Sequence, residues 1–378
     1  MSIDSLFPSA VVFDGDRVPA HFGNPFAEEQ SLRAGKAFSI LDRDVVVVRG
    51  VDRMKLLHLI SSRNFEQVPA GVSTEMLVLD AQGHIVHAAG AMSDAETTWL
   101  ITDFGYGQAL ADHIAKMTFM MRVETKVLAD PLVVGLLNWP GELPVELTSV
   151  ARCVWEDPWP TTAEGGATYG VDDVDHPAHG TRRTVVVVEQ TNTQRALEAL
   201  AGLLIKPAGF QAWEAARIVD WRPSLSREAH SSAIPHELDW LRTAVHLDKG
   251  CYPGQETVAK LVNLGKPPRR LVFLYLEGGE EELPEPRTEV SLQGRSVGEL
   301  TSVARAVDDG PVALALVKRN VPLDAVLTVG DFEASQVEIV GREGKSSASP
   351  QVRPGSGLSA RRLGGPPPAM SSKSLGGK

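Results

Sequence analysis

Apolar residues recur along the chain in short runs, and their spacing changes from one region to the next. Between residues 36 and 270 the runs predict strands and helices in alternation. Phe38–Val48 is apolar and rich in β-branched residues, which favours a strand. Thr74–Leu79 and His84–Met92 flank residues 80–83, a short turn that ends in glycine. This arrangement predicts a β-hairpin.

Helices are predicted where apolar residues return at the spacing of one helical face. Gly105–Met117 and Phe210–Val219 follow this pattern. Thr191 and Gln194 stand three residues apart before another such pattern, as in a capping box that begins a helix. Because a hairpin occurs beside these helices, the pattern indicates an α+β domain rather than a strictly parallel α/β sheet.

The pattern changes after residue 270. Six short strand-like runs follow one another with little helix between them: Leu271–Leu276, Glu289–Leu292, Ser296–Ser302, Val312–Val317, Ala325–Val329 and Glu333–Val340. Such close spacing predicts a small antiparallel barrel or sandwich. A proline-containing linker at residues 263–268 separates it from the first region. We therefore expect two folded domains, at residues 1–267 and 268–341.

Residues 342–378 are predicted to form a disordered basic tail. Twenty of its 37 residues are Gly, Pro or Ser, a composition that buries too little apolar surface to offset the entropy of ordering. The tail carries a formal charge of +6, which leaves −17 on the rest of a chain whose net charge is −11. An acidic body argues against direct binding of nucleic acid, which basic surfaces drive.

Composition narrows the class further. The 378 residues are 43% apolar and 22% charged, an ordinary globular balance. No apolar run approaches the ~18 residues that span a bilayer, and the start of the chain lacks the features of a secretion signal. The two distant cysteines, Cys153 and Cys251, suggest thiols in a reducing compartment. We expect a soluble cytoplasmic protein with no membrane partner and no dedicated metal site.

Candidate chemistry centres on residues 249–256, which read Lys-Gly-Cys-Tyr-Pro-Gly-Gln-Glu. Pro253 suits the first turn of a helix, so Cys251 is expected just before a helix N-terminus, where unpaired N–H groups favour an anion. Lys249 lies two residues away and adds positive charge. Both effects favour the reactive thiolate, which makes Cys251 and Lys249 candidate catalytic residues.

The same segment also fits a tight turn around a buried, inert cysteine, and its residues alone leave both interpretations open. Gly250 and Gly254 allow a close backbone approach around the sulfur. Gln255 and Glu256 are placed either to orient a ligand or to satisfy the first helical turn.

Residues 249–256 match the Lys-Gly-Cys-Tyr-x-Gly-Gln-Glu signature of the YgfZ folate-binding family, which is related to the glycine-cleavage T-protein, an aminomethyltransferase. Glu214–Ile218, Ile234–Glu237 and Gly298–Ser302 resemble flanking segments of that family. The resemblance covers roughly residues 38–340 and is strongest after Glu214.

This resemblance implies an aminomethyltransferase-like fold of two ferredoxin-like halves plus a C-terminal antiparallel β-barrel, arranged around a funnel that binds tetrahydrofolate. It further implies a role in making or repairing iron–sulfur clusters in client proteins and, in bacteria, an influence on tRNA modification. The candidate folate-binding residues are then Asn64, Arg217, Trp221, Gly250, Tyr252, Gly254, Gln255 and Glu256. A guanidinium suits the folate glutamate and aromatic rings suit the pterin, although the same side chains also fit a protein core.

Two positions depart from the T-protein pattern. T-proteins carry two aspartates after a Gly-Gly-Ile sequence, where this chain has His87 and Ala88. An imidazole and a methyl group do not replace a carboxylate beside a developing positive charge, which argues against aminomethyl transfer. A family glutamate near the pterin falls on Val219, so either Asp220 takes its place or pterin affinity is weaker.

The favoured hypothesis is a tetrahydrofolate-binding accessory protein for iron–sulfur proteins. In this hypothesis Cys251 is an ionised, accessible thiol at the mouth of a pterin-sized cavity. A folate-dependent aminomethyl or one-carbon transferase is the first alternative, and a scaffold with a vestigial folate site is the second.

Overall fold

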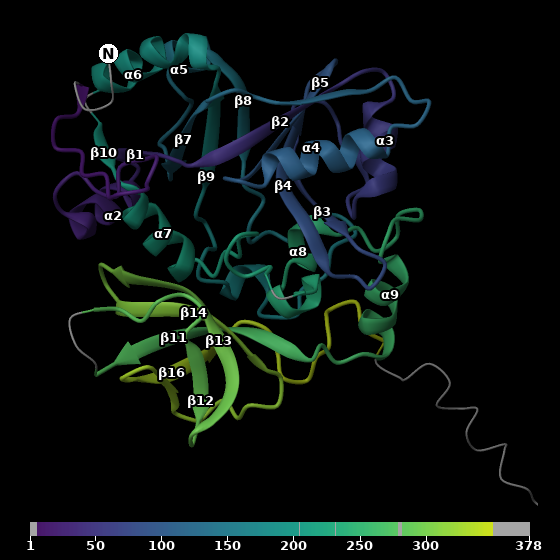
Figure 1. The fold of residues 1–378 in the computed structure, drawn as a ribbon, viewed down its shortest axis with the longest axis vertical. Coiled ribbons are helices and arrows are strands. Elements are labelled where there is room, and N and C mark those ends of the chain that lie inside the picture. Colours follow the sequence, from purple (N-terminus) through teal and green to yellow (C-terminus); the bar gives the residue numbers. More distant parts are fainter. Residues whose placement is uncertain (1–5, 204, 231, 279–281, 351–378) are drawn as a thin grey trace, which may run out of the picture.

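Two five-stranded sheets and a closed six-stranded barrel organise the chain, with the barrel below the sheets in the view of Figure 1. The structure is a computed structural model that describes residues 6–350 apart from 204, 231 and 279–281. Among these residues no helix is long and apolar enough to cross a membrane.

The first sheet has the strand order β10-β1-β7-β9-β8. Its strands are β1 (Ala37–Ile40), β7 (Leu132–Leu137), β8 (Ala151–Glu156), β9 (Arg183–Val188) and β10 (Lys206–Ala208). Apolar side chains of α5 (Val145–Thr148) and α6 (Thr193–Gly202) pack on one face. Side chains of α2 (Pro25–Arg33) and α7 (Phe210–Val219) pack on the other face.

The second sheet has the order β3-β4-β5-β2-β6. Its strands are β2 (Arg43–Arg49), β3 (Ser73–Leu79), β4 (Ile85–Ser93), β5 (Thr97–Asp103) and β6 (Glu124–Val127). The outer face is covered by α3 (Arg53–Ile60) and α4 (Gly107–Lys116), whose apolar sides share a core with it. The predicted hairpin is thus β3–β4, paired antiparallel as expected.

The inner faces of the two sheets share one apolar core, to which Val45, Trp99, Val133 and Trp155 contribute. A β-carbon added at Gly90 of β4 would lie 2.5 Å from Cε2 of Trp155, so the indole of β8 lies directly against the backbone of the second sheet. The close approach therefore requires glycine at this position.

The prediction of one strand over Phe38–Val48 is wrong. The chain leaves the first sheet after β1 and enters the second sheet at β2, so the apolar residues of this run serve both sheets. The charged residues 42–44, which are partly exposed, interrupt the run where the chain changes layer, and the prediction of a single strand overlooked this interruption.

The barrel closes in the order β11-β14-β13-β12-β15-β16. Its strands are β11 (Arg269–Glu277), β12 (Glu289–Leu292), β13 (Arg295–Ala306), β14 (Gly310–Lys318), β15 (Leu327–Val329) and β16 (Phe332–Glu338). All six correspond to the predicted runs, and the α+β class with a small antiparallel barrel is confirmed. Phe273 and Leu314 of the barrel join a core shared with Leu77 of β3 and Ile218 of α7, which attaches the barrel to the rest of the molecule.

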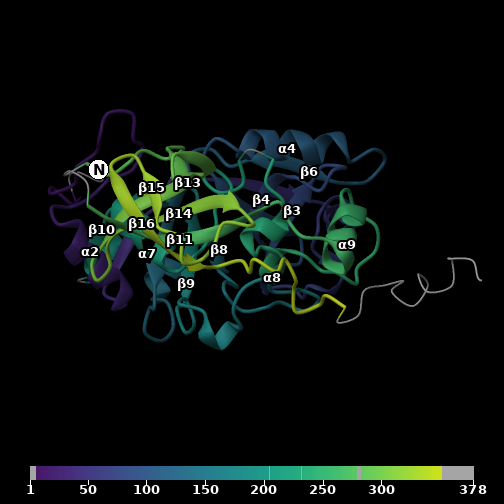
Figure 2. The ribbon, with the colours of Figure 1, turned by 90° about the horizontal axis from the view of Figure 1, so that it is seen from below.

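Short helices complete the chain: η1 (Phe65–Gln67), η2 (Asp173–Asp175), η3 (Gln190–Asn192), η4 (Pro235–Leu238), α8 (Leu241–Ala244) and α9 (Gln255–Leu264). The predicted capping box is wrong, because Thr191 lies inside η3 and α6 begins at Thr193, after Asn192, whose side chain makes no capping bond. Figure 2 shows α9 at one end of the molecule and α2 at the other.

Nine residues of the predicted tail, 342–350, belong to the described part of the chain. The Ser347 amide donates to the Thr168 carbonyl over 2.9 Å, and the Ser349 hydroxyl donates to the Val262 carbonyl over 2.7 Å. These contacts tie residues 342–350 to the folded body. Residues 351–378 lie outside the described residues.

Candidate functional site

The segment 249–256 connects α8 to α9 and presents Cys251 at the surface. The Cys251 thiol is exposed, as the reactive-thiol hypothesis requires. Pro253, however, does not lie in the first helical turn. The helix begins at Gln255, and Gly254 precedes it with a φ of +80°.

Gly254 is required by a close contact as well as by its backbone angle. A β-carbon there would lie 2.6 Å from the Asp80 carbonyl oxygen, in the turn between β3 and β4. That turn therefore packs on the start of α9 and fixes the chain just after Cys251. Gly250 is less crowded, and a β-carbon there would meet only the His58 imidazole, at 3.6 Å from Nε2.

The Lys249 ammonium points into the protein. It donates to the carbonyls of His58, Ser61 and Arg63, over 2.6 Å for Ser61 and 3.3 Å for Arg63, and the residue is 5% exposed. Burial lowers the pKa of Lys249 to about 8, partly opposed by the Glu66 carboxylate. These acceptors lie in the last turn of α3 and just after it. Carbonyls at the end of a helix lack intrahelical partners and carry the negative end of the helix dipole.

The other residues of the segment mostly hold the loop. Gln255 donates through Nε2 to the Lys249 carbonyl over 3.1 Å. The Tyr252 ring is 7% exposed and lies 4.9 Å from Lys249 Nζ, and burial raises the pKa of its phenol. Asn64 donates to Gln67 Oε1 over 2.6 Å. Glu256 is exposed on the first turn of α9.

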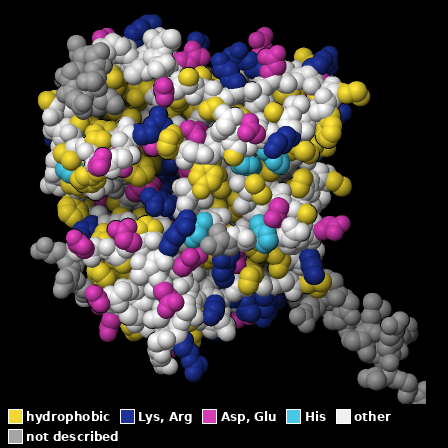
Figure 3. Space-filling model, in the orientation of Figure 1, with side chains coloured by type: hydrophobic (Ala, Val, Ile, Leu, Met, Phe, Trp, Pro, Cys, Tyr) yellow, Lys and Arg dark blue, Asp and Glu magenta, His cyan; other side chains and the backbone are white. Residues whose placement is uncertain are grey.

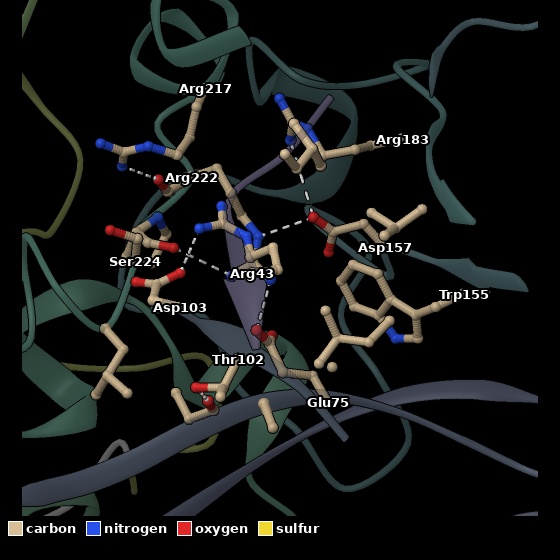
Figure 4. Close-up of a pocket in the computed structure, with 18 of the residues that line it drawn as sticks. Arg43, Glu75, Thr102, Asp103, Trp155, Asp157, Arg183, Arg217, Arg222 and Ser224 are labelled. Atoms are coloured by element: carbon tan, nitrogen blue, oxygen red, sulfur yellow. Dashed lines mark hydrogen bonds and ion pairs between the residues drawn. The ribbon is translucent and has the colours of Figure 1, made fainter. Parts of the chain in front are cut away.

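A second group of polar residues surrounds a cavity between the two sheets, drawn in Figure 4. The cavity has a volume of about 80 Å³, and its polar lining consists mainly of Arg43, Glu75, Asp103, Asp157, Arg183, Arg217 and Arg222. These charges are paired with one another or with neighbouring charges, as in Arg43 with Asp103 at 2.7 Å and Arg222 with Asp157 at 2.9 Å. A cavity of this size accommodates a few water molecules and is well below the ~300 Å³ at which ligand pockets begin.

Arg217 belongs to this network. Its guanidinium donates to Glu214, to Glu228 over 3.0 Å and to the Ser302 hydroxyl over 2.6 Å, and the residue is 3% exposed. The two carboxylates raise the pKa of Arg217 despite its burial. Through these contacts Arg217 links α7 to β13 of the barrel.

Trp221 and Asp220 follow α7 and are also engaged within the protein. The Trp221 ring lies 5.3 Å from that of His176 and 6.4 Å from that of Phe273, a residue of barrel strand β11. Asp220 is 1% exposed and accepts from Arg183 over 2.9 Å and from Arg33 over 3.4 Å. Its carboxylate is therefore held by two arginines rather than presented to a ligand.

The two positions that carry aspartates in T-proteins face opposite sides of β4. Ala88 lines the central cavity, whereas the His87 ring packs 5.5 Å from that of His113 on α4. Burial lowers the pKa of His87 to about 4, so its imidazole is neutral near pH 7. Neither residue places a carboxylate at the cavity.

A larger cavity adjoins the central one, and a still larger one adjoins that cavity in turn; the sequence indicated neither. One, of about 230 Å³, shares Arg43, Asp103 and Ser224 with the central cavity. The other, of about 410 Å³, lies between α7 and the barrel and shares Phe210 and Glu214 with the 230 Å³ cavity. Figure 3 shows a hollow in this face of the molecule, with acidic and basic side chains around it.

These two cavities are larger than the central one, and their linings combine charged and aromatic side chains. Arg227 and Phe210 line both, and Phe26 lines the larger of the two. Asp103 and Glu214 also line the 230 Å³ cavity, but Asp103 is bound by Arg43 and Ser226, and Glu214 by Arg217. Sequence reasoning missed the two cavities because their lining comes from segments far apart along the chain. No local motif marks them.

The structure therefore separates the predicted site residues into two places. Asn64, Gly250, Tyr252, Gly254 and Gln255 lie with Lys249 and Cys251 between α3 and α9, whereas Arg217 and Trp221 lie beside α7. Cys251 is not among the residues that line the three cavities described above. Figures 1 and 2 both show α9 well apart from α7.

The remaining question is which side chains could bind a metal ion or react as a thiol. In the described part of the chain, no group of three or more His, Cys, Asp or Glu side chains is arranged to hold a metal ion. Cys153 is 2% exposed, and burial raises the pKa of its thiol to about 12. Cys251 is thus the accessible thiol of the two.

Comparison with known proteins gave partial matches in sequence and a broad match in structure. No protein-family model matches the chain. A putative chloroplastic transferase of Arabidopsis thaliana is 32% identical over 148 residues, which cover 38% of this chain and 33% of that protein. A tRNA-modifying protein YgfZ of Edwardsiella ictaluri is 31% identical over 99 residues, 25% of this chain and 29% of that protein.

The matched segments thus span about a third of these relatives, 33% and 29% of their lengths. Among solved structures, the glycine cleavage system aminomethyltransferase T of Bartonella henselae superposes with a TM-score of 0.68 at 16% identity. That superposition covers 88% of this chain and 94% of the other and establishes the shared fold.

Proposed function

The chain belongs to a YgfZ-like family built on the aminomethyltransferase fold, and from this premise we propose that it is a tetrahydrofolate-binding accessory protein in iron–sulfur cluster assembly or repair. Cys251 is its functional thiol. Its partners are folate and iron–sulfur client or assembly proteins, and it works in the cytoplasm.

The observation that carries this proposal is the exposed Cys251 in a loop whose neighbours are fixed. Lys249 and Gly254, on either side of the thiol, are anchored to α3 and to the β3–β4 turn. A thiol held at the surface in this way is accessible to another protein, as an accessory role requires.

Tetrahydrofolate is assigned to the two larger cavities. Phe26 and Phe210 would contact the aromatic rings, and Arg227 would hold the glutamate carboxylate. Arg217 and Trp221 support this site from behind by fixing α7 against the barrel. We assign no contact with folate to the segment 249–256.

A one-carbon transferase is the second candidate, because the Arabidopsis relative is named a putative transferase and the fold is that of an aminomethyltransferase. The two positions that carry aspartates in T-proteins argue against it, since Ala88 has no carboxylate and His87 faces α4. The bacterial relatives are named tRNA-modifying proteins. For this chain we attribute such an effect to client enzymes that act on tRNA, because its acidic body disfavours direct tRNA binding.

The test separates folate binding from thiol function. Calorimetric titration with tetrahydrofolate is expected to give saturable heat with equal affinity for the wild type, Cys251→Ser and the control Cys153→Ser. In cells that lack the endogenous counterpart, the wild type and Cys153→Ser should restore the activity of iron–sulfur enzymes, and Cys251→Ser should not.

Other outcomes have distinct meanings. Absence of saturable heat would leave only a scaffold, and full restoration by Cys251→Ser would remove the thiol from the mechanism. Folate-dependent turnover of an aminomethyl donor would establish the transferase instead.

A further inference from the structure

The loop that carries Cys251 depends on one buried side chain. Lys249 has three N–H donors, and three carbonyls, those of His58, Ser61 and Arg63, receive them. Because the ammonium is committed to these acceptors and is buried while the thiol is exposed, its position suits fixing the loop better than activating the sulfur.

The same lysine reaches both sides of the thiol. Its backbone carbonyl accepts from Gln255 at the start of α9, and its Nζ lies 4.9 Å from the Tyr252 ring centroid, within the range of a cation–π contact. The residues that flank the Gly250–Cys251 pair are Lys249 and Tyr252. Both are therefore held in place by the Lys249 side chain, whose ammonium also contacts the Tyr252 ring.

Neighbouring contacts anchor the chain before Lys249 to the same region. The His246 amide donates to the Ser62 carbonyl over 2.9 Å, and the Ser62 hydroxyl donates to the Ala244 carbonyl over 2.6 Å. Lys249 is thus the last of a series of attachments to the segment after α3, and it is the one nearest the thiol.

We propose that Lys249 is a positioning residue for Cys251: by capping the end of α3 it fixes the loop in which the exposed thiol meets its partner. The inference rests on the proposed function only in taking Cys251 as the functional thiol. It predicts that loss of the lysine mobilises the thiol while leaving the folate cavities intact.

The test attaches a nitroxide to Cys251 in a Cys153→Ser background. The Cys251 thiolate attacks a methanethiosulfonate label, a sulfur–sulfur bond forms and methanesulfinate leaves. The electron paramagnetic resonance spectrum should show a restricted label in the parent protein and a mobile label in Lys249→Met. Lys249→Arg keeps the charge and should restore part of the restriction. Lys260→Met, at an exposed lysine of α9, is the matched control and should resemble the parent.

A second measurement needs no substitution at Lys249. Raising the pH through the Lys249 pKa of about 8 removes a proton that a carbonyl requires, so the label should become mobile on the parent protein. Burial lowers the pKa values of the nearby His58 and His246 and raises that of Tyr252, so these groups keep their protonation state in this window, and Glu66 supplies a carboxylate. The label occupies the thiol, whose own ionisation therefore does not contribute.

The result that overturns the proposal is a label that stays restricted in folded Lys249→Met or, should that variant not fold, across the pH change in the parent protein. Neither measurement involves folate or a client enzyme. Failure here is therefore distinguishable from failure of the proposed function, which is read from tetrahydrofolate binding and from enzyme restoration by Cys251→Ser.

Discussion

Replacement of Arg222 by methionine tests whether the charge network around the central cavity is part of the stable fold. Arg222 donates to Glu75 and, over 2.9 Å, to Asp157, and all three side chains are at most 8% exposed. Methionine keeps much of the length and volume but leaves Glu75 without its cation. Asp157 keeps a weaker partner, Arg183, at 3.8 Å.

The expected loss follows from this burial. Breaking a buried pair by removing one partner costs about 3–5 kcal/mol, because the other charge stays desolvated. Burial already raises the pKa of Glu75, and Arg222 opposes that rise, so the variant should raise it further. A carboxyl with a raised pKa in the folded state contributes stability at low pH and loses it as the pH rises, so the deficit should shrink between pH 8 and pH 5.

Urea unfolding followed by tryptophan fluorescence at both pH values measures the effect. Arg152→Met is the matched control, because Arg152 pairs with Glu189 at the surface with its side chain 51% exposed, and such pairs contribute about 0–1 kcal/mol. Adding Glu75→Gln to Arg222→Met should recover part of the loss. A deficit no larger than that of Arg152→Met, or one that grows as the pH falls, would refute the reasoning.

Two further substitutions test the packing of the sheets and the protonation of β4. Gly90→Ala should destabilise the protein by about 1–3 kcal/mol, because the added carbon would lie 2.5 Å from the Trp155 indole, whereas Gly202→Ala, with open space around it, should not; thermal unfolding distinguishes them. His87→Leu should flatten the loss of stability between pH 6.5 and 5, where the unfolded imidazole binds a proton that the folded one, with a pKa of about 4, does not; the slope removed is at most about 1.4 kcal/mol per pH unit. His179→Leu, at an exposed histidine, should leave that slope unchanged in the same urea series.

The separation of the thiol from the cavities changes how the proposed function is understood. Were Cys251 to act on a bound folate, it would have to lie beside the ligand, but Cys251 is not among the residues that line the two cavities assigned to folate. Two separate sites are consistent with an accessory protein whose folate site and partner-facing thiol work apart. The titration and the restoration assay read these two sites independently.

Several elements could be predicted from local patterns of residues alone. Helix α7 was predicted with its observed limits, and the six barrel strands matched because short strand-like runs separated by turn residues are local features of the sequence. The segment 249–256 also identified Cys251, since its signature is contiguous and needs no knowledge of the fold. The signature did not reveal the start of α9, because a glycine with positive φ, rather than Pro253, precedes the helix.

The surroundings of each buried charge, by contrast, become visible only in the folded chain. Lys249 and the carbonyl of His58 are 191 residues apart, and Arg222 and Glu75 are 147 residues apart, so no local pattern connects either pair. Burial and hydrogen bonding depend on contacts between distant segments, and these contacts turn the Lys249 ammonium toward the end of α3 and bury Arg217 in the charge network.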